Sequence, residues 1–303
     1  MSTELLVPRF AVLLSAYNGI KWLEPQVRTI IAQRAVRVTI FVSIDQSSDA
    51  TEDWIKHNAL INTNIVVLPV GERFGGAAKN FFRLIRDVDF KNFDYLSFAD
   101  QDDIWLEDKL ITAHEKIVEY GVSGYSGNVT AFWPDGREYL IDKAQQQKKY
   151  DFLFEAAGPG CTYVLKIAQA LSFKEFLVRN WTFANGISLH DWLIYAWFRS
   201  NGLKWYIDPV PKMLYRQHNN NQVGANSGIK ALVARVNLLR TGWYRQEIWK
   251  IAFLLGDKIP GLPNSLSENG KIPRRFLFTN AKRLRRRFRD QIFLLVIVAL
   301  GIY

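Results

Sequence analysis

The chain has only one cysteine, Cys161, among its 303 residues. A single cysteine excludes an intramolecular disulfide and favours a reducing compartment. The first ten residues contain no basic segment followed by an apolar one, so we expect no secretory signal there. These absences indicate a protein of the cytoplasm. With 49% hydrophobic and 22% charged residues, the composition is that of a globular chain, and the length suits one large domain or one domain with an appendage.

Acidic residues are scarce in one part of the chain. Residues 271–290 contain nine Lys or Arg against one acid, Asp290, and supply +8 of the net charge of +10. The rest of the protein is therefore close to neutral. A basic tail does not make the body of the protein a nucleic-acid-binding surface, so we expect no nucleic-acid partner.

The apolar run at the C-terminus is too short to span a membrane. Residues 292–303 form an uncharged segment of twelve residues, about 18 Å of helix against a hydrocarbon core of ~30 Å. Leu277, Ala281, Leu284 and Phe288 precede it at helical spacing, with arginines between them. A basic amphipathic helix that ends in an apolar segment predicts an interfacial anchor on an anionic membrane surface. The alternative is a C-terminal helix packed on the domain.

The first 120 residues alternate short apolar runs with helical patterns, which predicts an α/β fold with a mostly parallel sheet and helices on both faces. The expected strands cover residues 12–16, 38–44, 64–68 and 95–99. The expected helices cover residues 20–33, 50–60 and 75–87, and Asp49 is the expected N-cap of the second helix.

The middle of the chain, residues 121–218, is less regular. We expect two helices and two short strands there, at residues 167–177, 188–200, 206–208 and 213–216. The polar loop of residues 219–228 is either a lid or a linker. The expected organisation is thus one domain of residues 1–228, with halves at 1–120 and 121–228, followed by a basic helical region at 229–303.

Three carboxylates, Asp100, Asp102 and Asp103, follow the apolar run of residues 95–99. Their mutual repulsion costs free energy unless a cation or a ligand offsets it. Carboxylate oxygens are hard ligands that suit Mg²⁺ or Mn²⁺, which in turn bind diphosphates. The alternative is a solvated acidic turn that caps a helix beginning near Leu106. The sequence favours a metal–diphosphate site, in which Asp103 is the least certain member because it could serve only as the cap.

Polar groups follow three of the expected strands, at residues 15–18, 45–49 and 100–103. The carboxyl ends of parallel strands meet at one edge of a sheet, and ligands bind in the crevice outside that edge. We therefore expect the three loops to converge on one binding site.

Five motifs occur in order along the chain, at residues 14–19, 43–51, 99–105, 190–192 and 215–218. This set resembles the family 2 glycosyltransferases with a GT-A fold, especially the bacterial rhamnosyltransferase-like branch that builds surface polysaccharides. The likeness spans roughly residues 10–225 and leaves the basic tail outside it. It implies a Rossmann-like sheet and inverting transfer of a sugar from a nucleoside diphosphate sugar.

The resemblance implies a donor-binding set at the strand ends. Its members are Ser15, Ala16, Tyr17, Asp45, Lys79 and Asp100. Asp45 matches the aspartate that hydrogen-bonds the base, and Lys79 lies where relatives hold residues near the diphosphate, although a solvated helix position explains Lys79 equally well. The chain departs from the family here, because Ile44 replaces one of the usual two acids and Gln46 replaces the usual glycine. Asp45 is then the one carboxylate left to hydrogen-bond the base of the donor nucleotide, so the motif alone does not define which nucleotide is preferred.

The resemblance also implies a metal set. Asp100 and Asp102 match the DxD pair that holds Mg²⁺ or Mn²⁺, and Asp102 is the better candidate for direct ligation. His218 matches a histidine that completes the metal shell or touches the diphosphate. An ordinary loop histidine is the alternative for His218.

Asp191 matches the catalytic base of the family. A carboxylate at that place takes the proton of the acceptor hydroxyl as its oxygen attacks the anomeric carbon. From the residues alone, Asp191 is equally well a helix-capping acid. Trp105 and Trp192 are expected to stack on the acceptor sugar, with core packing as the alternative for both. Cys161 is expected to be a small buried filler.

The expected function is therefore metal-dependent, inverting transfer of a sugar, best L-rhamnose from dTDP-L-rhamnose, to a saccharide on a polyprenyl-diphosphate carrier. A UDP-hexose donor and a catalytically silent scaffold subunit are the alternatives. A lipid-linked acceptor would place the enzyme peripherally on the cytoplasmic face of the inner (plasma) membrane.

Overall fold

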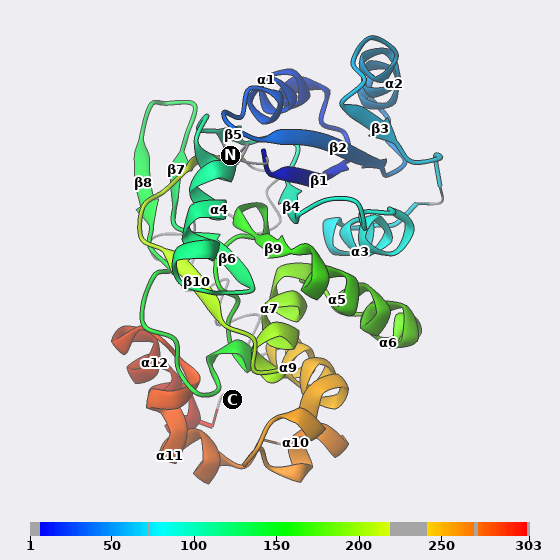
Figure 1. Cartoon of the computed structure of the whole chain (residues 1–303). Helices are drawn as coiled ribbons and strands as arrows, with labels where there is room; N and C mark the ends of the chain where they lie inside the picture. Colours follow the sequence, from blue (N-terminus) through cyan, green and yellow to red (C-terminus); the bar gives the residue numbers. More distant parts are fainter. Residues whose placement is uncertain (1–6, 72, 219–240, 270–271, 302–303) are drawn as a thin grey trace, which may run out of the picture.

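The computed structural model describes residues 7–71, 73–218, 241–269 and 272–301. The expected lid or linker at residues 219–228 and the expected boundary after residue 228 lie outside these ranges. The described chain contains one large sheet with helices on both faces, a smaller second sheet, and a helical region at the C-terminal end (Figure 1).

The large sheet has seven strands in the order β10-β6-β9-β4-β1-β2-β3. The strands are β1 (Arg9–Ala16), β2 (Arg37–Ile44), β3 (Ile65–Val67), β4 (Tyr95–Ala99), β6 (Gly124–Gly127), β9 (Val164–Lys166) and β10 (Trp205–Asp208). All pairs are parallel except those of β9, which runs antiparallel to both β4 and β6. The predicted mostly parallel sheet is confirmed.

The apolar side chains of each strand point alternately to the two faces of the sheet, which divides the core into two apolar clusters. On β1, Ala11 and Leu13 join one cluster, whereas Val12 and Leu14 join the other. This follows from the two-residue period of a strand, which sends neighbouring side chains to opposite faces. The sheet is therefore buried on both sides, as a mostly parallel sheet requires.

Helices cover both faces of the sheet. They are α1 (Ile20–Ile31), α2 (Thr51–Ile61), α3 (Ala77–Asp87), α4 (Lys109–Glu119), α5 (Ile167–Arg179), α6 (Trp181–Ala184) and α7 (His190–Ser200). Helix α1 packs on the Val12 side through Leu23 and Val27, and α3 packs on the opposite side through Phe81 (Figure 1). The first three helices lie where the sequence predicts them, within two residues at each end.

The second sheet has the order β5-β11-β7-β8 and was not predicted as a sheet. Its strands are β5 (Ile104–Trp105), β7 (Val129–Phe132), β8 (Glu138–Ile141) and β11 (Met213–Arg216). Strand β11 pairs antiparallel with β5, which directly follows the carboxylate segment. This pairing brings the residues after Met213 next to Asp102 and Asp103, although they are more than a hundred residues apart in the chain.

The C-terminal region is helical and packs on the part of the domain formed by residues 121–218. It contains α9 (Trp243–Leu255), α10 (Asn264–Asn269), α11 (Arg274–Leu284) and α12 (Phe288–Ala299). Leu277, Leu284 and Leu294 belong to the same apolar cluster as Phe81. The alternative of a packed C-terminal helix is thus realised. No helix among the described residues has both the length and the apolarity needed to cross a membrane.

A break separates α11 from α12, where the sequence suggested one continuous amphipathic helix. Arg285 and Arg287 have extended backbones, and between them the Arg286 side chain turns inward and is fully buried. Its guanidinium pairs with Asp151 at 3.2 Å and with Glu155 at 3.5 Å. Helical spacing could not reveal this break, because its cause is an ion-pair partner far away in the chain.

Candidate active site

The three predicted loops converge, and the side chain of Gln101 joins two of them. Its Oε1 accepts a hydrogen bond from the Tyr17 backbone N at 2.7 Å, and its Nε2 donates to the Tyr17 carbonyl at 2.8 Å. A Cβ atom at Gly19 would overlap the Gln101 side chain, which would have to shift to make room for it. The loop after β1 is thereby fixed to the carboxylate segment after β4.

The loop after β2 is fixed to the same place. Asn18 has a left-handed backbone, with φ of 45°, and its Oδ1 accepts from the Ser48 backbone N at 2.7 Å. Asp49 accepts from the backbone N–H groups of Ile20 and Thr51, the first residues of α1 and α2. The N-cap position of α2 is held by Ala50 and not by Asp49 as predicted, but the Asp49 carboxylate still accepts from the first N–H group of both helices.

Asp45 lies at the predicted strand end, but its carboxylate is already engaged. It is buried and accepts from the backbone N–H groups of Gln46, Phe74 and Gly75 at 2.8–2.9 Å. These bonds hold the segment that leads into α3. Contact of Asp45 with the donor base stays a prediction, and the structure gives this carboxylate a loop-holding role as well.

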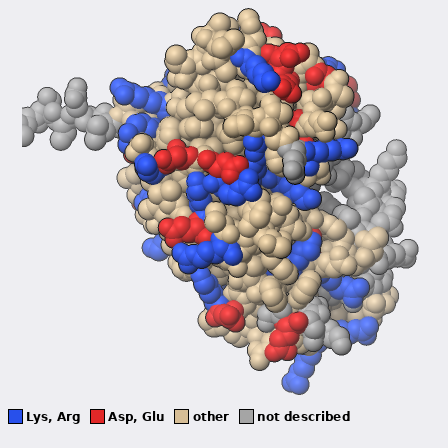
Figure 2. Space-filling view, turned by 90° about the vertical axis from the view of Figure 1, so that its right-hand side faces the viewer, with Lys and Arg blue, Asp and Glu red and all other residues tan. Residues whose placement is uncertain are grey.

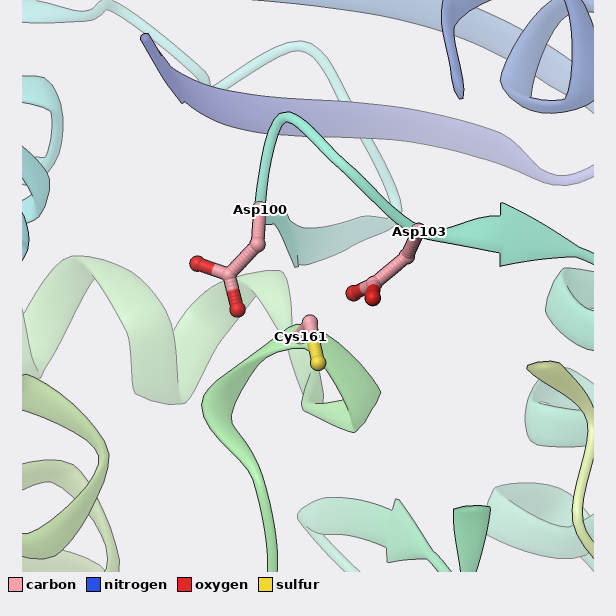
Figure 3. Close-up of side chains that lie close together, drawn as sticks. All are labelled: Asp100, Asp103 and Cys161. Atoms are coloured by element: carbon pink, nitrogen blue, oxygen red, sulfur yellow. The ribbon is translucent and has the colours of Figure 1, made fainter. Parts of the chain in front are cut away.

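The carboxylate segment folds so that Asp100 and Asp103 face Cys161 (Figure 3). One ligand atom from each of these three residues lies within 4.8 Å of the other two. Asp103 is fully buried, its Oδ1 accepts from the Arg216 backbone N at 3.1 Å, and its Oδ2 has no partner among the described residues. Burial and the neighbouring carboxylates raise the pKa of Asp103 well above its usual range.

The suggested capping role of Asp103 is wrong. The next helix, α4, begins at Lys109, with Asp108 at its N-cap position. Asp103 instead lies inside the cluster and receives a backbone N–H from β11. The burial of Asp103 makes it a structural and electrostatic member of the site.

Lys109 is a buried cation that the sequence analysis missed. Its Nζ donates to the Cys161 carbonyl at 2.9 Å and lies 3.0 Å from the centre of the Trp105 ring. Burial lowers the pKa of Lys109 to about 7, while Asp103 and Asp100 act in the opposite direction. Lys109 therefore supplies part of the positive charge that the carboxylate cluster needs. A lysine at the start of an amphipathic helix carries no sequence signal for such burial.

Asp102 points to a different partner, His218. The His218 Nε2 lies 2.7 Å from Asp102 Oδ2, and both side chains are largely shielded from solvent. The His218 ring stacks on Trp22 at 5.7 Å between centres, and the Arg216 guanidinium lies over the same indole. Arg216 Nε also donates to the Asp102 carbonyl at 2.8 Å. The predicted pair of Asp102 and His218 is brought together, and Trp22 and Arg216 were missed although Arg216 lies within a recognised motif.

Asp191 lies in the first turn of α7, beside the turn that contains Gly160. Its Oδ1 accepts from the Trp192 backbone N at 2.8 Å, and a Cβ built on Gly160 would lie 3.2 Å from the Asp191 Cβ. Burial raises the pKa of Asp191 to about 6. Burial, Asp102 and Asp191 together raise the pKa of Asp100 to about 7. The predicted base and the carboxylate cluster thus belong to one electrostatic site.

The two predicted acceptor tryptophans lie in the core. Trp105 and Trp192 are both buried; Lys109 covers the Trp105 ring, and Tyr244 stacks on the Trp192 ring at 5.5 Å between centres. Trp192 Nε1 donates to the Phe152 carbonyl at 2.9 Å. Neither indole offers a free face to a sugar, so the core-packing alternative describes both.

The predicted donor residues lie at the strand ends. Ser15 is half-buried and Ala16 is buried at the end of β1, whereas Tyr17 just beyond it is exposed. Lys79 is exposed in the first turn of α3. Their contact with a donor stays a prediction. Cys161 is a buried free thiol, as expected.

The residue types in the cluster fit a divalent cation. Asp102 and His218 present an oxygen and a nitrogen side by side, Asp103 has a buried oxygen without a partner among the described residues, and the charges of Asp102 and Asp191 both act on Asp100. Carboxylate oxygens with one imidazole suit Mn²⁺ or Mg²⁺. Asp100, Asp102 and His218 therefore remain the residues that could hold the ion, with Asp103 as an additional donor.

The chain is similar to known glycosyltransferases. Residues 11–169 match the profile of glycosyl transferase family 2. The chain is 45% identical over 291 residues to the dTDP-rhamnosyl transferase RfbG of Shigella flexneri, covering 96% of this chain and all of that protein.

Two solved structures share the fold. The first is S. aureus TarS 1-349 in complex with UDP-GlcNAc, with a TM-score of 0.55, 13% identity, and coverage of 97% of this chain and 93% of that one. The second is the mannosyltransferase PcManGT from Pyrobaculum calidifontis with GDP-Man and Mn²⁺, with a TM-score of 0.51, 15% identity, and coverage of 97% and 87%. At these identities the likeness concerns the fold alone.

Proposed function

The chain belongs to glycosyl transferase family 2, and from this premise we propose that it transfers L-rhamnose from dTDP-L-rhamnose to a lipid-linked saccharide acceptor. The observation that carries the proposal is the position of Asp191, a carboxylate with a raised pKa beside the carboxylate cluster. The choice of donor is supported by the 45% identity to a dTDP-rhamnosyl transferase over that protein's full length.

Asp191 has the properties of a general base for this reaction. A pKa of about 6 keeps the carboxylate ionised near neutral pH and still basic enough to accept a proton. Its fixed bond to the Trp192 backbone N holds the side chain at the start of α7. The acceptor oxygen forms its bond to the anomeric carbon as its proton passes to Asp191. The anomeric carbon–oxygen bond to the diphosphate breaks, its electron pair leaves with dTDP, and the anomeric centre is inverted.

The carboxylate segment serves the leaving group. A bound Mg²⁺ or Mn²⁺ supplies Lewis-acid neutralisation of the charge that develops on the departing diphosphate. Asp102 and His218, which are in contact at 2.7 Å, would hold that ion together with Asp100, whose pKa the charge of Asp102 raises. Gln101 fixes the same segment to the loop after β1, where Tyr17 is exposed. The residues for the leaving group thus come from both halves of the chain, whereas the base Asp191 comes from the second half.

The test is nucleotide release by the purified full-length chain. Release of dTDP from dTDP-rhamnose should require a divalent cation and an undecaprenyl-diphosphate-linked saccharide, and UDP-glucose should be a poor donor. Asp191→Asn should lower kcat by about 10²–10⁴-fold, the usual contribution of a general base. The matched control is Asp53→Asn, since Asp53 is likewise an acid in the first turn of a helix but is exposed on α2.

Each outcome has a definite meaning. Full activity of Asp191→Asn would refute the base assignment. Release of UDP from UDP-glucose at the higher rate would refute the donor assignment while leaving the base assignment intact.

A further inference from the structure

Helix α12 carries a second apolar face in addition to the face that packs on the domain. Phe288, Ile292, Val296 and Leu300 are 70%, 46%, 48% and 67% exposed. They recur every fourth residue, so they lie along one side of the helix and are here called the α12 stripe. The opposite side, with Leu294 and Ile297, is buried in the core. Packing on the domain therefore accounts for the apolar residues on one side of this helix but not for those of the α12 stripe.

Cations lie at both ends of the α12 stripe. Arg289 follows Phe288 directly and is 72% exposed. At the other end, the Arg274 guanidinium lies next to Gly301, where a Cβ atom would approach its Nη2 to 3.2 Å. Helix α11, which packs against α12 (Figure 1), exposes further cations. These are Arg275, Lys282 and Arg283.

Acids do not balance these cations. Asp290 is the only acid among the described residues from 272 to 301, and it is already within 4 Å of Arg285 and Arg289. The face shown in Figure 2 differs, because there Lys and Arg side chains lie next to Asp and Glu side chains. The α11–α12 surface therefore combines an exposed apolar stripe with unbalanced positive charge.

We infer that the α12 stripe and its flanking cations form a docking surface for an anionic lipid bilayer, an inference that rests on the proposed lipid-linked acceptor. The helix would lie flat in the interface, because its other face is held in the core by Leu294 and Ile297. An interfacial helix of this kind buries one apolar face among the lipid headgroups while cations contact anionic lipids. The stripe of about 18 Å runs along the surface and does not cross it.

The positive charge of this surface favours an anionic bilayer over a second copy of the chain as its binding partner. An isologous contact through this surface would place each copy's exposed cations against the same cations of its partner. An anionic lipid surface attracts them instead, at about 1 kcal/mol for each residue.

The experiment is cosedimentation of the full-length chain with vesicles of phosphatidylcholine, with and without phosphatidylglycerol. The variant Phe288→Ser/Ile292→Ser/Val296→Ser should lose at least about tenfold in partitioning, because three apolar side chains no longer enter the interface. Its matched control is Leu60→Ser/Ile61→Ser, since these side chains are 85% and 72% exposed on α2. The control should partition like the unsubstituted protein.

A second variant tests the charge. Arg274→Gln/Lys282→Gln/Arg289→Gln should weaken binding to the anionic vesicles on the order of a hundredfold. Substitution of exposed cations elsewhere, Lys56→Gln/Arg137→Gln/Arg179→Gln, should have little effect.

Unchanged partitioning of the serine variant would overturn the inference, as would equal binding to both kinds of vesicle. A dimer in analytical ultracentrifugation that the serine substitutions dissociate would also overturn it, in favour of self-association. Donor turnover with the undecaprenyl-diphosphate-linked saccharide in detergent micelles, without vesicles, distinguishes this failure from failure of the proposed function. The serine variant should keep that turnover, and a chain that binds vesicles through the stripe but releases no dTDP would refute only the proposed function.

Discussion

Arg286 makes the strongest prediction about stability, because its charged side chain is fully buried in an ion-pair network. Its partner Asp151 is fully buried as well, at 3.2 Å, and also accepts from Arg199 and the Tyr195 hydroxyl. Removing one member of a buried ion pair costs about 3–5 kcal/mol, since the remaining charge is left without its partner. Arg199 and Tyr195 still serve Asp151 in Arg286→Met, so we expect the lower end, about 3 kcal/mol.

This cost should appear as a lower melting temperature. For a chain of this size, about 3 kcal/mol corresponds to a decrease in Tm on the order of 5–10 °C. Scanning calorimetry or fluorimetry of Arg286→Met measures it, with the exposed Arg283→Met as the control. Equal Tm values for the two variants would refute the idea that the basic segment is an integral part of the catalytic fold. Truncation before Ile272 should likewise destabilise the domain rather than only release it from membranes.

Three further predictions concern catalysis. Because Asp191 acts as the base in its ionised form and has a pKa of about 6, kcat/KM for dTDP release should rise with pH and level off above about pH 6; a flat profile from about pH 5 to 7 would contradict this. Gly19→Ala should raise the donor KM, because the added methyl group overlaps the Gln101 side chain; the double variant with Gln101→Ala should be less impaired than additivity of the two single changes predicts. EDTA should abolish transfer and Mn²⁺ or Mg²⁺ should restore it, whereas Asp102→Asn should require more metal; transfer that survives EDTA would exclude the metal requirement.

Strong local periodicity made the first half of the fold predictable. The strand at Tyr95–Ala99 has the predicted bounds, and the convergence of three strand-end loops followed from the geometry of parallel strands. The same reasoning located Asp102, whereas Asp191 was identified only through its resemblance to a family motif. Local pattern and resemblance together therefore identified most of the candidate site.

Features that depend on distant contacts were not predictable. Strand β6, Gly124–Gly127, contains two glycines and no alternation of apolar residues, so its place in the sheet follows only from pairing with β9 and β10. Lys109 has the appearance of a surface residue, and its burial depends on a carbonyl at Cys161. The tryptophans at 105 and 192 are equally suited to a sugar or to a core, and only packing decides between them.

The paired hydrogen bonds of Gln101 have a consequence for which residues position 101 can hold. Strand β1 pairs with β4 as far as Leu14 and Ala99, and beyond that point the Gln101 amide takes the place of a neighbouring backbone for Tyr17. A side chain there must both donate and accept, and must be long enough to reach. Glutamate has the length but lacks the donor, and asparagine has both groups but is one methylene shorter. Glutamine is thus hard to replace at this position of the acidic segment, although it carries no charge.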